Sequence, residues 1–445
     1  MIKDAWALAI EALSWIELQR LGERLALAKT ARQLGINDPK ILGLAHKLII
    51  ETLRRQNLID ALINSVLAPR SLGEFKLGTR AFLRLYTYSI KFEGGDIAKA
   101  SLIARTGRSI LGWRQLNDVE ETFGKILSKN VEEIVSKATD EEKVALQTYN
   151  PTWFVRYCFR MLGRSEAIKF LASTSETTPT YLRLNTLMNS EENLLEKLKN
   201  EGAILEKEPK IGFTYRLLEN KVPLTRMQSF GEGLFYIQDK ASCLAAEASD
   251  PKAGMTVLDV CAAPGAKTTH LAQLMKNEGS IYSVDYSRRR MTVWEREIER
   301  MGVKIASPVV ADACKLLPVK LEADLVVLDP PCTSTGAFAK APSAKWRLTS
   351  RSVVHMADIQ WKMLNNCAEY VKEGGSLVYS TCSVTLEENE MLIERFLKWH
   401  LDFALTETSP KIGVDGFRGL SQCQRLFPHL HQCNGFFIAK LIRQS

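Results

Sequence analysis

Apolar side chains follow a helical spacing through the first 130 residues and change to short strand-like runs further along the chain. Residues 41–53, 58–67 and 79–88 place apolar groups three and four positions apart, which predicts amphipathic helices. From Gly233 onward, strand-like and helical stretches alternate, and this order favours a parallel sheet with helices on both faces. The strands that the pattern predicts are Thr256–Val260, Ser280–Val284, Ser307–Ala311, Ala323–Leu328, Ser376–Ser380 and Gly435–Leu441.

The chain has 445 residues, which is too long for one ordinary hydrophobic core, so several domains are expected. Residues 1–130 predict an all-α domain. The charge-rich residues 131–150 end at an Asn-Pro pair and predict a linker. Residues 151–232 predict a small α/β subdomain, and residues 233–445 an α/β domain with a doubly wound sheet. The elements expected within the subdomain are a strand at Thr180–Asn185, a helix near Glu191–Asn200 and strands at Ile204 and Tyr215–Leu218.

Two cysteines follow predicted strands and are the main candidates for chemistry. Cys332 ends the run Asp329-Pro330-Pro331-Cys332, and Cys382 follows Ser380-Thr381. Ligands and reacting groups of open α/β sheets gather at the carboxyl ends of the strands. A thiolate is a soft nucleophile that can add to a pyrimidine ring and later leave. The pair therefore predicts covalent chemistry on a nucleobase.

A turn of small residues lies between the strand Thr256–Val260 and the helical stretch that begins at Thr268. It reads Cys261-Ala262-Ala263-Pro264-Gly265-Ala266-Lys267. Small side chains let backbone amides approach a ligand, and the following helix N-terminus offers unpaired N–H groups. We expect a cofactor pocket here. The turn lacks the Gly-x-Gly-x-x-Gly fingerprint, which makes a dinucleotide less favoured.

Three acidic residues stand at the ends of successive predicted strands: Asp285, Asp312 and Asp329. An isolated strand-end aspartate is usually a cap or a turn former. Three at matching positions on one sheet edge favour a binding site. Asp285 lies about twenty residues beyond the small-residue turn, where an acid accepts hydrogen bonds from ribose hydroxyls in doubly wound folds.

Together these motifs resemble the RsmB/NOP/Sun family of RNA cytosine-5 methyltransferases, from about Pro151 to the C-terminus. The motifs that carry the resemblance are Phe235–Ser242, Cys261–Lys267, Asp285, Asp312, Asp329–Cys332, Thr381-Cys382 and Asn434–Phe437. The chain departs from the family at Ala266, where a second glycine is usual, and at Asn434, where an aspartate is usual. The resemblance implies a Rossmann-like methyltransferase domain and S-adenosylmethionine as cofactor.

The resemblance also implies a role for each site residue. Cys382 would be the nucleophile and Cys332 the residue that assists breakdown of the adduct. Asp329 would contact the N3 side of the target base and line the cofactor site, and Lys267 would hold the base or that carboxylate. The remaining cofactor contacts would come from Asp285 at the ribose, Asp312 at the adenine amine, and the backbone of Cys261, Ala262, Ala263, Pro264, Gly265, Ala266 and Lys267.

The same resemblance bears on the substrate. The helical N-terminal part resembles the NusB-like RNA-binding domain of the RsmB branch, which implies small-subunit ribosomal RNA as the substrate. Transfer RNA is the alternative substrate. A non-catalytic RNA-binding assembly factor is the alternative function. An exocyclic-amine methyltransferase is disfavoured because an aromatic residue would follow its Asp-Pro-Pro turn, where this chain has Cys332. Family members commonly act as monomers.

Several local hypotheses complete the sequence analysis. Thr385 and Glu388 have capping-box spacing, so a helix beginning there would place its positive end near Cys382. Arg183 and Asn185 read equally well as solvated strand residues and as residues that grip RNA. His270 reads as a surface or cap residue. A zinc site at Cys423, His429, His431 and Cys433 is disfavoured because their spacings do not match paired ligands, and no metal is expected.

Charge and cysteine content indicate what kind of partner and compartment the protein has. Lys and Arg exceed Asp and Glu by 59 to 51, a net charge of +8, which makes a polyanion a plausible partner. Nine cysteines in a chain of this length do not form a disulfide framework, and those outside the motifs read as small packing residues. Neither a signal-peptide pattern nor a membrane-spanning run is evident, so we expect a cytoplasmic protein that does not contact membranes.

Overall fold

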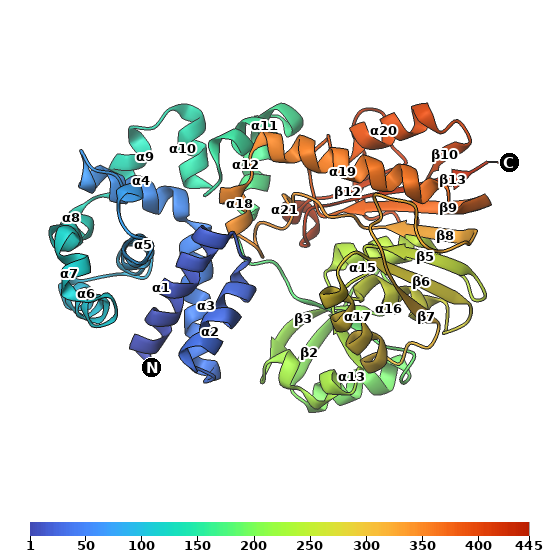
Figure 1. Ribbon diagram of the computed structural model, residues 1–445, viewed down its shortest axis with the longest axis horizontal. Coiled ribbons are helices and arrows are strands. Elements are labelled where there is room, and N and C mark those ends of the chain that lie inside the picture. Colours follow the sequence, from blue (N-terminus) through green and yellow to red (C-terminus); the bar gives the residue numbers. More distant parts are fainter. Residues whose placement is uncertain (445) are drawn as a thin grey trace. The chain divides into compact units, whose positions relative to one another are not determined.

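The computed structural model describes residues 1–444, which form two compact units (Figure 1). The first consists of Met1–Thr177 together with Phe338–Thr349, and the second of Thr178–Ala337 and the described chain from Ser350 onward. Every helix of the described residues is too short or too polar to cross a lipid bilayer.

The first unit is entirely helical. Its core is formed by the apolar faces of the long helices, where the rings of Tyr86 and Phe123 lie 4.9 Å apart between centroids. The helices predicted at 41–53, 58–67 and 79–88 are confirmed. The helices are α1 (Ile2–Gln19), α2 (Glu23–Leu34), α3 (Pro39–Arg54), α4 (Gln56–Leu67), α5 (Leu77–Lys91), α6 (Ile97–Leu111), α7 (Trp113–Leu116), α8 (Glu120–Ser128), α9 (Val131–Ser136), α10 (Asp140–Gln147), α11 (Thr152–Leu162), α12 (Arg164–Ser173) and α18 (Ser343–Arg347), with 3-10 turns η1 (Leu72–Glu74) and η2 (Asn117–Val119).

Residues 131–150, predicted as a linker, are helical and belong to the first unit. They form α9 and α10, and α10 begins with a capping box in which Glu142 accepts hydrogen bonds from the Thr139 hydroxyl and backbone N–H. The charges lie on the solvent side, while Val144 and Ala145 are buried. Helices α11 and α12 also belong to this unit, although residues 151–177 were grouped with the α/β subdomain.

A short piece of the later chain, Phe338–Thr349, is part of the helical unit. Ser343 donates its backbone N–H to Glu23 (2.7 Å), and the Trp346 indole N–H donates to the carbonyl of Leu53 (2.6 Å). The Lys345 ammonium is fully buried and donates to Ser175 Oγ (2.8 Å) and to a backbone carbonyl. Burial lowers its pKa well below the ordinary value, and nearby arginines add to this effect. This segment is therefore fixed by packing rather than being a loose loop.

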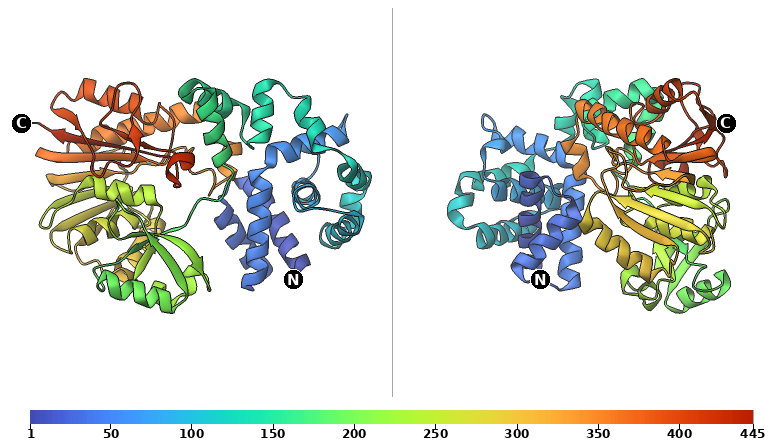
Figure 2. Two further views of the ribbon diagram at one scale, coloured as in Figure 1. Left: turned by 180° about the vertical axis from the view of Figure 1, so that it is seen from behind. Right: turned by 45° about the vertical axis from the view of Figure 1, so that its right-hand side comes forward.

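The second unit contains a four-stranded antiparallel sheet in the order β2-β3-β1-β4, packed against α13 (Figure 2). The strand at 180–185 and the helix at 191–200 are confirmed. The sheet extends past residue 232, because its edge strand β4 follows that point. Its elements are β1 (Tyr181–Leu184), α13 (Glu191–Asn200), β2 (Ala203–Lys207), β3 (Thr214–Asn220), η3 (Leu224–Arg226), α14 (Gln228–Gly231) and β4 (Phe235–Ile237).

The main sheet of this unit has nine strands in the order β11-β12-β13-β9-β8-β5-β6-β7, with β10 paired to β13. Strands β7, β6, β5, β8 and β9 are parallel, and β13 runs antiparallel to β9. The six predicted strands are confirmed, and β10, β11 and β12 were not predicted. The strands are β5 (Thr256–Val260), β6 (Ser280–Asp285), β7 (Ala306–Val310), β8 (Ala323–Leu328), β9 (Val371–Thr381), β10 (Phe403–Thr406), β11 (Val414–Asp415), β12 (Gln424–Leu426) and β13 (Phe436–Arg443).

Alternate residues of each central strand face opposite helical layers. Val257 and Leu325 pack with α15 (Lys240–Ser249), α16 (Ala266–Leu274) and α17 (Arg288–Arg300). Leu258 and Val326 pack with α19 (Ser350–Ala368) and α20 (Glu390–Trp399) on the other face (Figure 1). A further short helix, α21 (Pro428–His431), precedes β13. This three-layer, Rossmann-like arrangement confirms the predicted fold class and brings the carboxyl ends of β5, β6, β8 and β9 to one edge of the sheet.

Candidate active site

The two candidate cysteines meet at this edge of the sheet. Cys332 follows β8 and Cys382 follows β9, and their sulfur atoms lie 3.2 Å apart. Both thiols are half-buried. The loops that carry them are joined where Gly336 donates its N–H to the carbonyl of Cys382 (3.0 Å). The structure therefore brings together two residues that are fifty positions apart in the sequence.

The surroundings of the two sulfurs favour a thiolate on Cys382 and a thiol on Cys332. The hydrogen bond between the thiols lowers the pKa of Cys382, and a contact with Ser334 Oγ at 3.4 Å lowers it further, whereas burial opposes the shift. For Cys332 the same hydrogen bond, together with burial, raises the pKa well above its ordinary value. Sequence reasoning missed Ser334, which has a left-handed backbone (φ 55°) and whose Oγ lies 3.9 Å from Cys332 Sγ as well as 3.4 Å from Cys382 Sγ.

The proposed activation of Cys382 by a helix N-terminus is wrong. Helix α20 begins at Glu390, eight residues after Cys382, so no helix starts at Thr385. Thr385 Oγ1 does donate to Glu388 Oε2 (2.7 Å), but as part of a buried network rather than a capping box. The Glu388 carboxylate points into the protein because the loops after both cysteines donate hydrogen bonds to it. If Glu388 faced solvent as a helix cap, those donors would have no partner.

Lys267 and Asp329 form an ion pair beside the cysteines. Lys267 lies in the first turn of α16 with its side chain buried, and Asp329 follows β8 with its side chain about one-third exposed. Ser380 Oγ lies 3.5 Å from Asp329 Oδ1, and the Lys267 ammonium lies 5.6 Å from the centroid of the Phe436 ring. The pair connects the small-residue turn to the strand ends that carry the thiols.

The small-residue turn leads into α16 with a left-handed residue at each end. Cys261 has φ 66° and Gly265 has φ 113°. Gly265 is the N-cap and has no side chain to cap the first turn, so the first N–H groups of α16 stay available. A Cβ at Gly265 would lie 3.4 Å from Trp294. Ala266 is already helical, so an alanine meets no backbone conflict at the position where the family usually has a second glycine.

The strand-end acids differ in burial. Asp285 ends β6 with a side chain about 1% exposed, and its Oδ2 accepts no hydrogen bond within residues 1–444, although Arg290 Nη1 lies 3.0 Å away as an ion pair. Asp312 follows β7 and is exposed, and its Oδ1 accepts the N–H of Cys314 (3.0 Å). A buried carboxylate oxygen with spare acceptor capacity fits a ligand that offers hydroxyl donors.

Arg183 and Asn185 are neither solvated nor available to RNA. Both side chains are fully buried. Arg183 donates to Gln238 Oε1 (2.9 Å), Thr269 Oγ1 (2.7 Å) and the Gln273 side chain, which ties β1 to α16. Asn185 donates to the carbonyls of Gly233 (2.8 Å) and Met301 (2.9 Å). Both readings offered for these residues are corrected, because an alternating strand pattern does not reveal that both faces of β1 are covered.

His270 is also buried, not at the surface as expected. Burial lowers its pKa to about 4, so the imidazole is neutral at physiological pH. Of the cysteines read as packing residues, Cys314 is half-buried and the others are buried, namely Cys158, Cys243, Cys367, Cys423 and Cys433. Within residues 1–444 the structure places no three His, Cys, Asp or Glu side chains where they could hold a metal ion.

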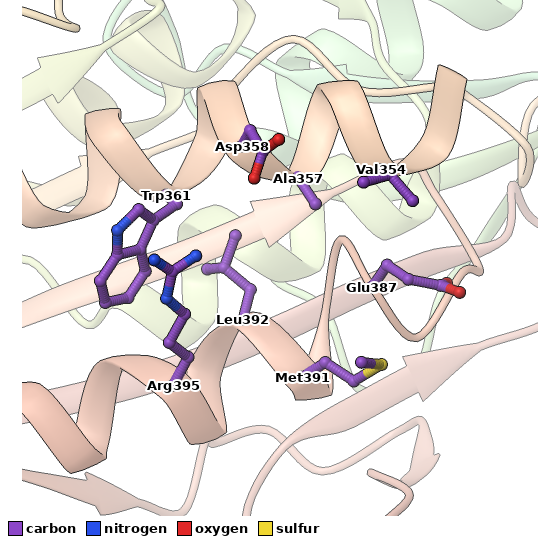
Figure 3. A pocket seen from close by; sticks show the side chains of 8 residues that line it. All are labelled: Val354, Ala357, Asp358, Trp361, Glu387, Met391, Leu392 and Arg395. Atoms are coloured by element: carbon purple, nitrogen blue, oxygen red, sulfur yellow. The ribbon is translucent and has the colours of Figure 1, made fainter. Parts of the chain in front are cut away.

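A groove of about 240 Å³ between α19 and α20 lies apart from these residues (Figure 3). Its lining combines apolar side chains with Trp361, whose ring is covered by the Arg395 guanidinium at 3.9 Å from the centroid. Glu387 points into it from the loop before α20. None of the predicted site residues lines this groove, so we do not assign the reaction to it.

Comparison with known proteins agrees with the geometry. The family model described as 16S rRNA methyltransferase RsmB/F matches residues 246–442. The probable ribosomal RNA small subunit methyltransferase B of Synechocystis sp. is 29% identical over 405 residues, which cover 89% of this chain and 90% of that protein. The tRNA (cytosine(72)-C(5))-methyltransferase of Pyrococcus horikoshii is 38% identical over 222 residues, which cover 50% of this chain and 56% of that protein.

A solved structure of a methyltransferase homolog protein from Pyrococcus horikoshii is 30% identical, with a TM-score of 0.63, and the match covers 69% of this chain and 99% of that one. The matched residues 246–442 span the small-residue turn, the strand-end acids and both cysteines. The family model, the similar proteins and the sheet topology thus agree with the order of the motifs along the chain. The chain belongs to the RsmB/F family of RNA cytosine-C5 methyltransferases.

Proposed function

We propose that this protein transfers a methyl group from S-adenosylmethionine to C5 of cytosine in small-subunit ribosomal RNA, through a covalent adduct between Cys382 and C6. The observation that carries the proposal is the pair of sulfur atoms 3.2 Å apart at the ends of β8 and β9, of which Cys382 is favoured as thiolate. A single reactive thiol would suit many reactions. A thiolate beside a protonated thiol suits one that both forms and breaks a carbon–sulfur bond.

C5 of cytosine is a poor nucleophile until a group adds at C6. The Cys382 thiolate supplies that group by forming a bond from Sγ to C6, which makes C5 electron-rich. Bound S-adenosylmethionine supplies an electrophilic methyl group. After methylation C5 still carries its hydrogen, and loss of this proton to a base returns the electron pair that expels Cys382 from C6. Cys332 lies within contact of the departing sulfur and assists this last step.

Asp329 and Lys267 would orient the base. Lys267 holds the Asp329 carboxylate by an ion pair, which leaves one face of that group for the N3 side of the ring. Negative charge that develops on the ring during attack lies near the Lys267 ammonium, which stabilises it. The target cytosine must be single-stranded or flipped, because C5 and C6 are covered within a stacked helix.

The residues at the other strand ends fit the cofactor. The open first turn of α16 would receive the carboxylate of its methionine part, and the spare acceptor of Asp285 would receive ribose hydroxyls. Asp312 would accept the adenine amine. The backbone from Cys261 to Lys267 would enclose the methionine part. Carboxylates around a sulfonium cation are also favourable electrostatically.

One observation favours ribosomal over transfer RNA. The Synechocystis relative, named for small-subunit ribosomal RNA, aligns with 89% of this chain, whereas the transfer-RNA relative aligns with half of it. We also propose that the helical unit binds RNA, in line with the net positive charge of the chain. That part of the proposal requires charge substitutions for its test, because deleting helices would expose the buried segment Phe338–Thr349.

The proposal is tested with the full chain, labelled S-adenosylmethionine and unmodified ribosomal or transfer RNA. Label is expected on C5 of cytosine in small-subunit ribosomal RNA. Cys382→Ala should abolish transfer, and Cys332→Ala should accumulate a denaturant-resistant protein–RNA adduct. Cys158→Ala, which removes a buried thiol of the helical unit, is the matched control and should retain activity. Label on an exocyclic nitrogen, or full activity of Cys382→Ala, would refute the mechanism, and preferential labelling of transfer RNA would refute the substrate.

A further inference from the structure

Glu388 is a fully buried carboxylate that contacts the loops of both cysteines. Its Oε1 accepts the backbone N–H of Thr333 (2.8 Å) and the side-chain amide of Gln360 (2.9 Å). Its Oε2 accepts the hydroxyls of Thr333 (2.5 Å), Ser383 (2.5 Å) and Thr385 (2.7 Å). Five donors therefore converge on one side chain.

The network follows the two cysteines closely in sequence. Thr333 is the residue after Cys332, and Ser383 is the residue after Cys382. Gln360 also donates to the carbonyl of Pro331, the residue before Cys332 (2.9 Å). The carboxylate thus contacts the Cys332 loop directly at Thr333 and through Gln360 at Pro331, and it contacts the Cys382 loop at Ser383 and Thr385.

All five groups that contact Glu388 are neutral donors. Within residues 1–444 no lysine, arginine or histidine forms an ion pair with it. A carboxylate has only acceptor sites, so five donors match its ionised form, but they do not cancel its charge. Its electrostatic field therefore acts on neighbouring groups, among them the Cys332 loop, which the network contacts at Thr333 directly and at Pro331 through Gln360.

We propose that Glu388 is a positioning residue that determines which of the two cysteines carries the negative charge: its carboxylate keeps Cys332 protonated, so that the Cys332 thiol donates to a thiolate on Cys382. This inference rests on the proposed function, because it explains why Cys382 rather than Cys332 is the nucleophile. No bond is made or broken by Glu388 itself.

The charges around the pair are consistent with this assignment. The negative charge of Glu388 adds to the rise in the pKa of Cys332, after the contributions of Cys382 and of burial. On the other side, the Ser334 hydroxyl and the Lys267 ammonium lower the pKa of Cys382, and the Asp329 carboxylate opposes them. Among the described residues, Glu388 is thus an acid that acts on the Cys332 thiol, and Asp329 and Lys267 are an acid and a cation that act on the Cys382 thiol.

The test measures thiol reactivity in the full chain without RNA or cofactor. Iodoacetamide alkylates thiolates, so peptide mass spectrometry of the two sites gives the ratio of Cys382 to Cys332 modification as a function of pH. In the native protein we expect Cys382 to react first. Glu388→Gln should reduce the ratio by about tenfold, since one pKa unit corresponds to a tenfold change in ionisation. Its pH profile for Cys332 should shift to lower pH.

Glu387→Gln is the matched control, because it makes the same chemical change one residue earlier, where the side chain points into the groove between α19 and α20 (Figure 3). It should leave the ratio unchanged. Glu388→Asp retains the charge but is shorter by one methylene, which draws the charge away from Thr333, so its ratio should lie between those of the native protein and Glu388→Gln. This second variant also provides the test if Glu388→Gln does not fold.

A ratio that stays native in Glu388→Asp, or in folded Glu388→Gln, would overturn the inference and reduce Glu388 to a structural residue. That outcome would leave the proposed methyl transfer intact, since it is measured without RNA. Conversely, a native protein in which Cys332 reacts first would contradict the assignment of Cys382 as the thiolate in the proposed function, whatever the variants show.

Discussion

Replacement of Arg183 by methionine tests the conclusion that this buried cation is structural rather than a contact to RNA. The guanidinium donates three hydrogen bonds, to Gln238, Thr269 and Gln273, across the junction of β1 and α16. Methionine retains most of the side-chain volume and removes every donor. The variant therefore isolates the polar contribution from the packing contribution.

The magnitude follows from two opposing contributions. Hydrogen bonds from a charged donor contribute about 1.5–3 kcal/mol each. Burial lowers the pKa of Arg183 to about 10, which corresponds to a cost of about 3 kcal/mol for keeping it charged. The difference favours the native protein, and we expect Arg183→Met to lower the free energy of unfolding of the second unit by about 2–6 kcal/mol.

The assay is guanidinium unfolding of the full chain followed by circular dichroism, with amide hydrogen exchange of β1 and α16 to locate the change. Arg216→Met is the matched control. It lies on β3 opposite Tyr181 and makes one surface hydrogen bond to Gln432 (2.8 Å), so its effect should stay within about 0.5 kcal/mol.

RNA binding gives an independent check that Arg183 is structural. If it is structural, the dependence of the RNA association constant on salt concentration should be the same in Arg183→Met and the native protein. A residue that neutralises a phosphate in single-stranded RNA contributes about 0.7 to the slope of log K against log salt. A loss of slope of that size, with native stability, would refute the structural reading.

Two further predictions concern the pH dependence of stability and the approach of the cysteine loops. Burial lowers the pKa of His270 to about 4 and raises that of Asp259 to about 6. His270 therefore costs stability as pH falls below 6.5, and Asp259 costs stability as pH rises above 3.8, each by up to about 3 kcal/mol. The free energy of unfolding of each variant is compared with that of the native protein between pH 4 and 6.5. As pH rises, His270→Gln should become less stable relative to the native protein, and Asp259→Asn should become more stable relative to it. Curves that run parallel to the native one would contradict both assignments. Gly336→Ala would place a Cβ 2.1 Å from the carbonyl oxygen of Gly435, so the loop that donates a hydrogen bond to Cys382 must move. Initial rates should then show kcat reduced by about a hundredfold, with KM for the cofactor nearly unchanged. An unchanged kcat would show that the loops tolerate the shift.

The parallel sheet and the placement of the two cysteines were predictable because they depend on local patterns. Apolar runs of the length of a strand set β5 and β8, and the topology of such sheets brings their carboxyl ends to one edge. The burial of Arg183 could not be predicted in the same way. Its burial depends on α16 covering β1, and the partners lie more than fifty residues away. A charged residue in an alternating strand gives no signal of such a contact.

The misplaced helix start near Cys382 has a related cause. Thr385 and Glu388 have the spacing of a capping box, and the local sequence supports a helix that begins there. The donors that actually bind Glu388 include Thr333 and Gln360, which sequence reasoning cannot place near it. A long-range network therefore displaced a local preference, and the same network led to the proposal for Glu388.

The loop that carries Cys332 is restrained on both sides, and this explains why a glycine far away in the sequence belongs to the site. Gly336 donates to the carbonyl of Cys382 and accepts the N–H of Gly435 (2.8 Å), and its Cα would lie 2.8 Å from a Cβ at Gly435. Neither glycine is required by its φ angle; both are required because two backbones approach too closely for any side chain. Two residues later, at Phe338, the chain enters the helical unit and is held there by packing.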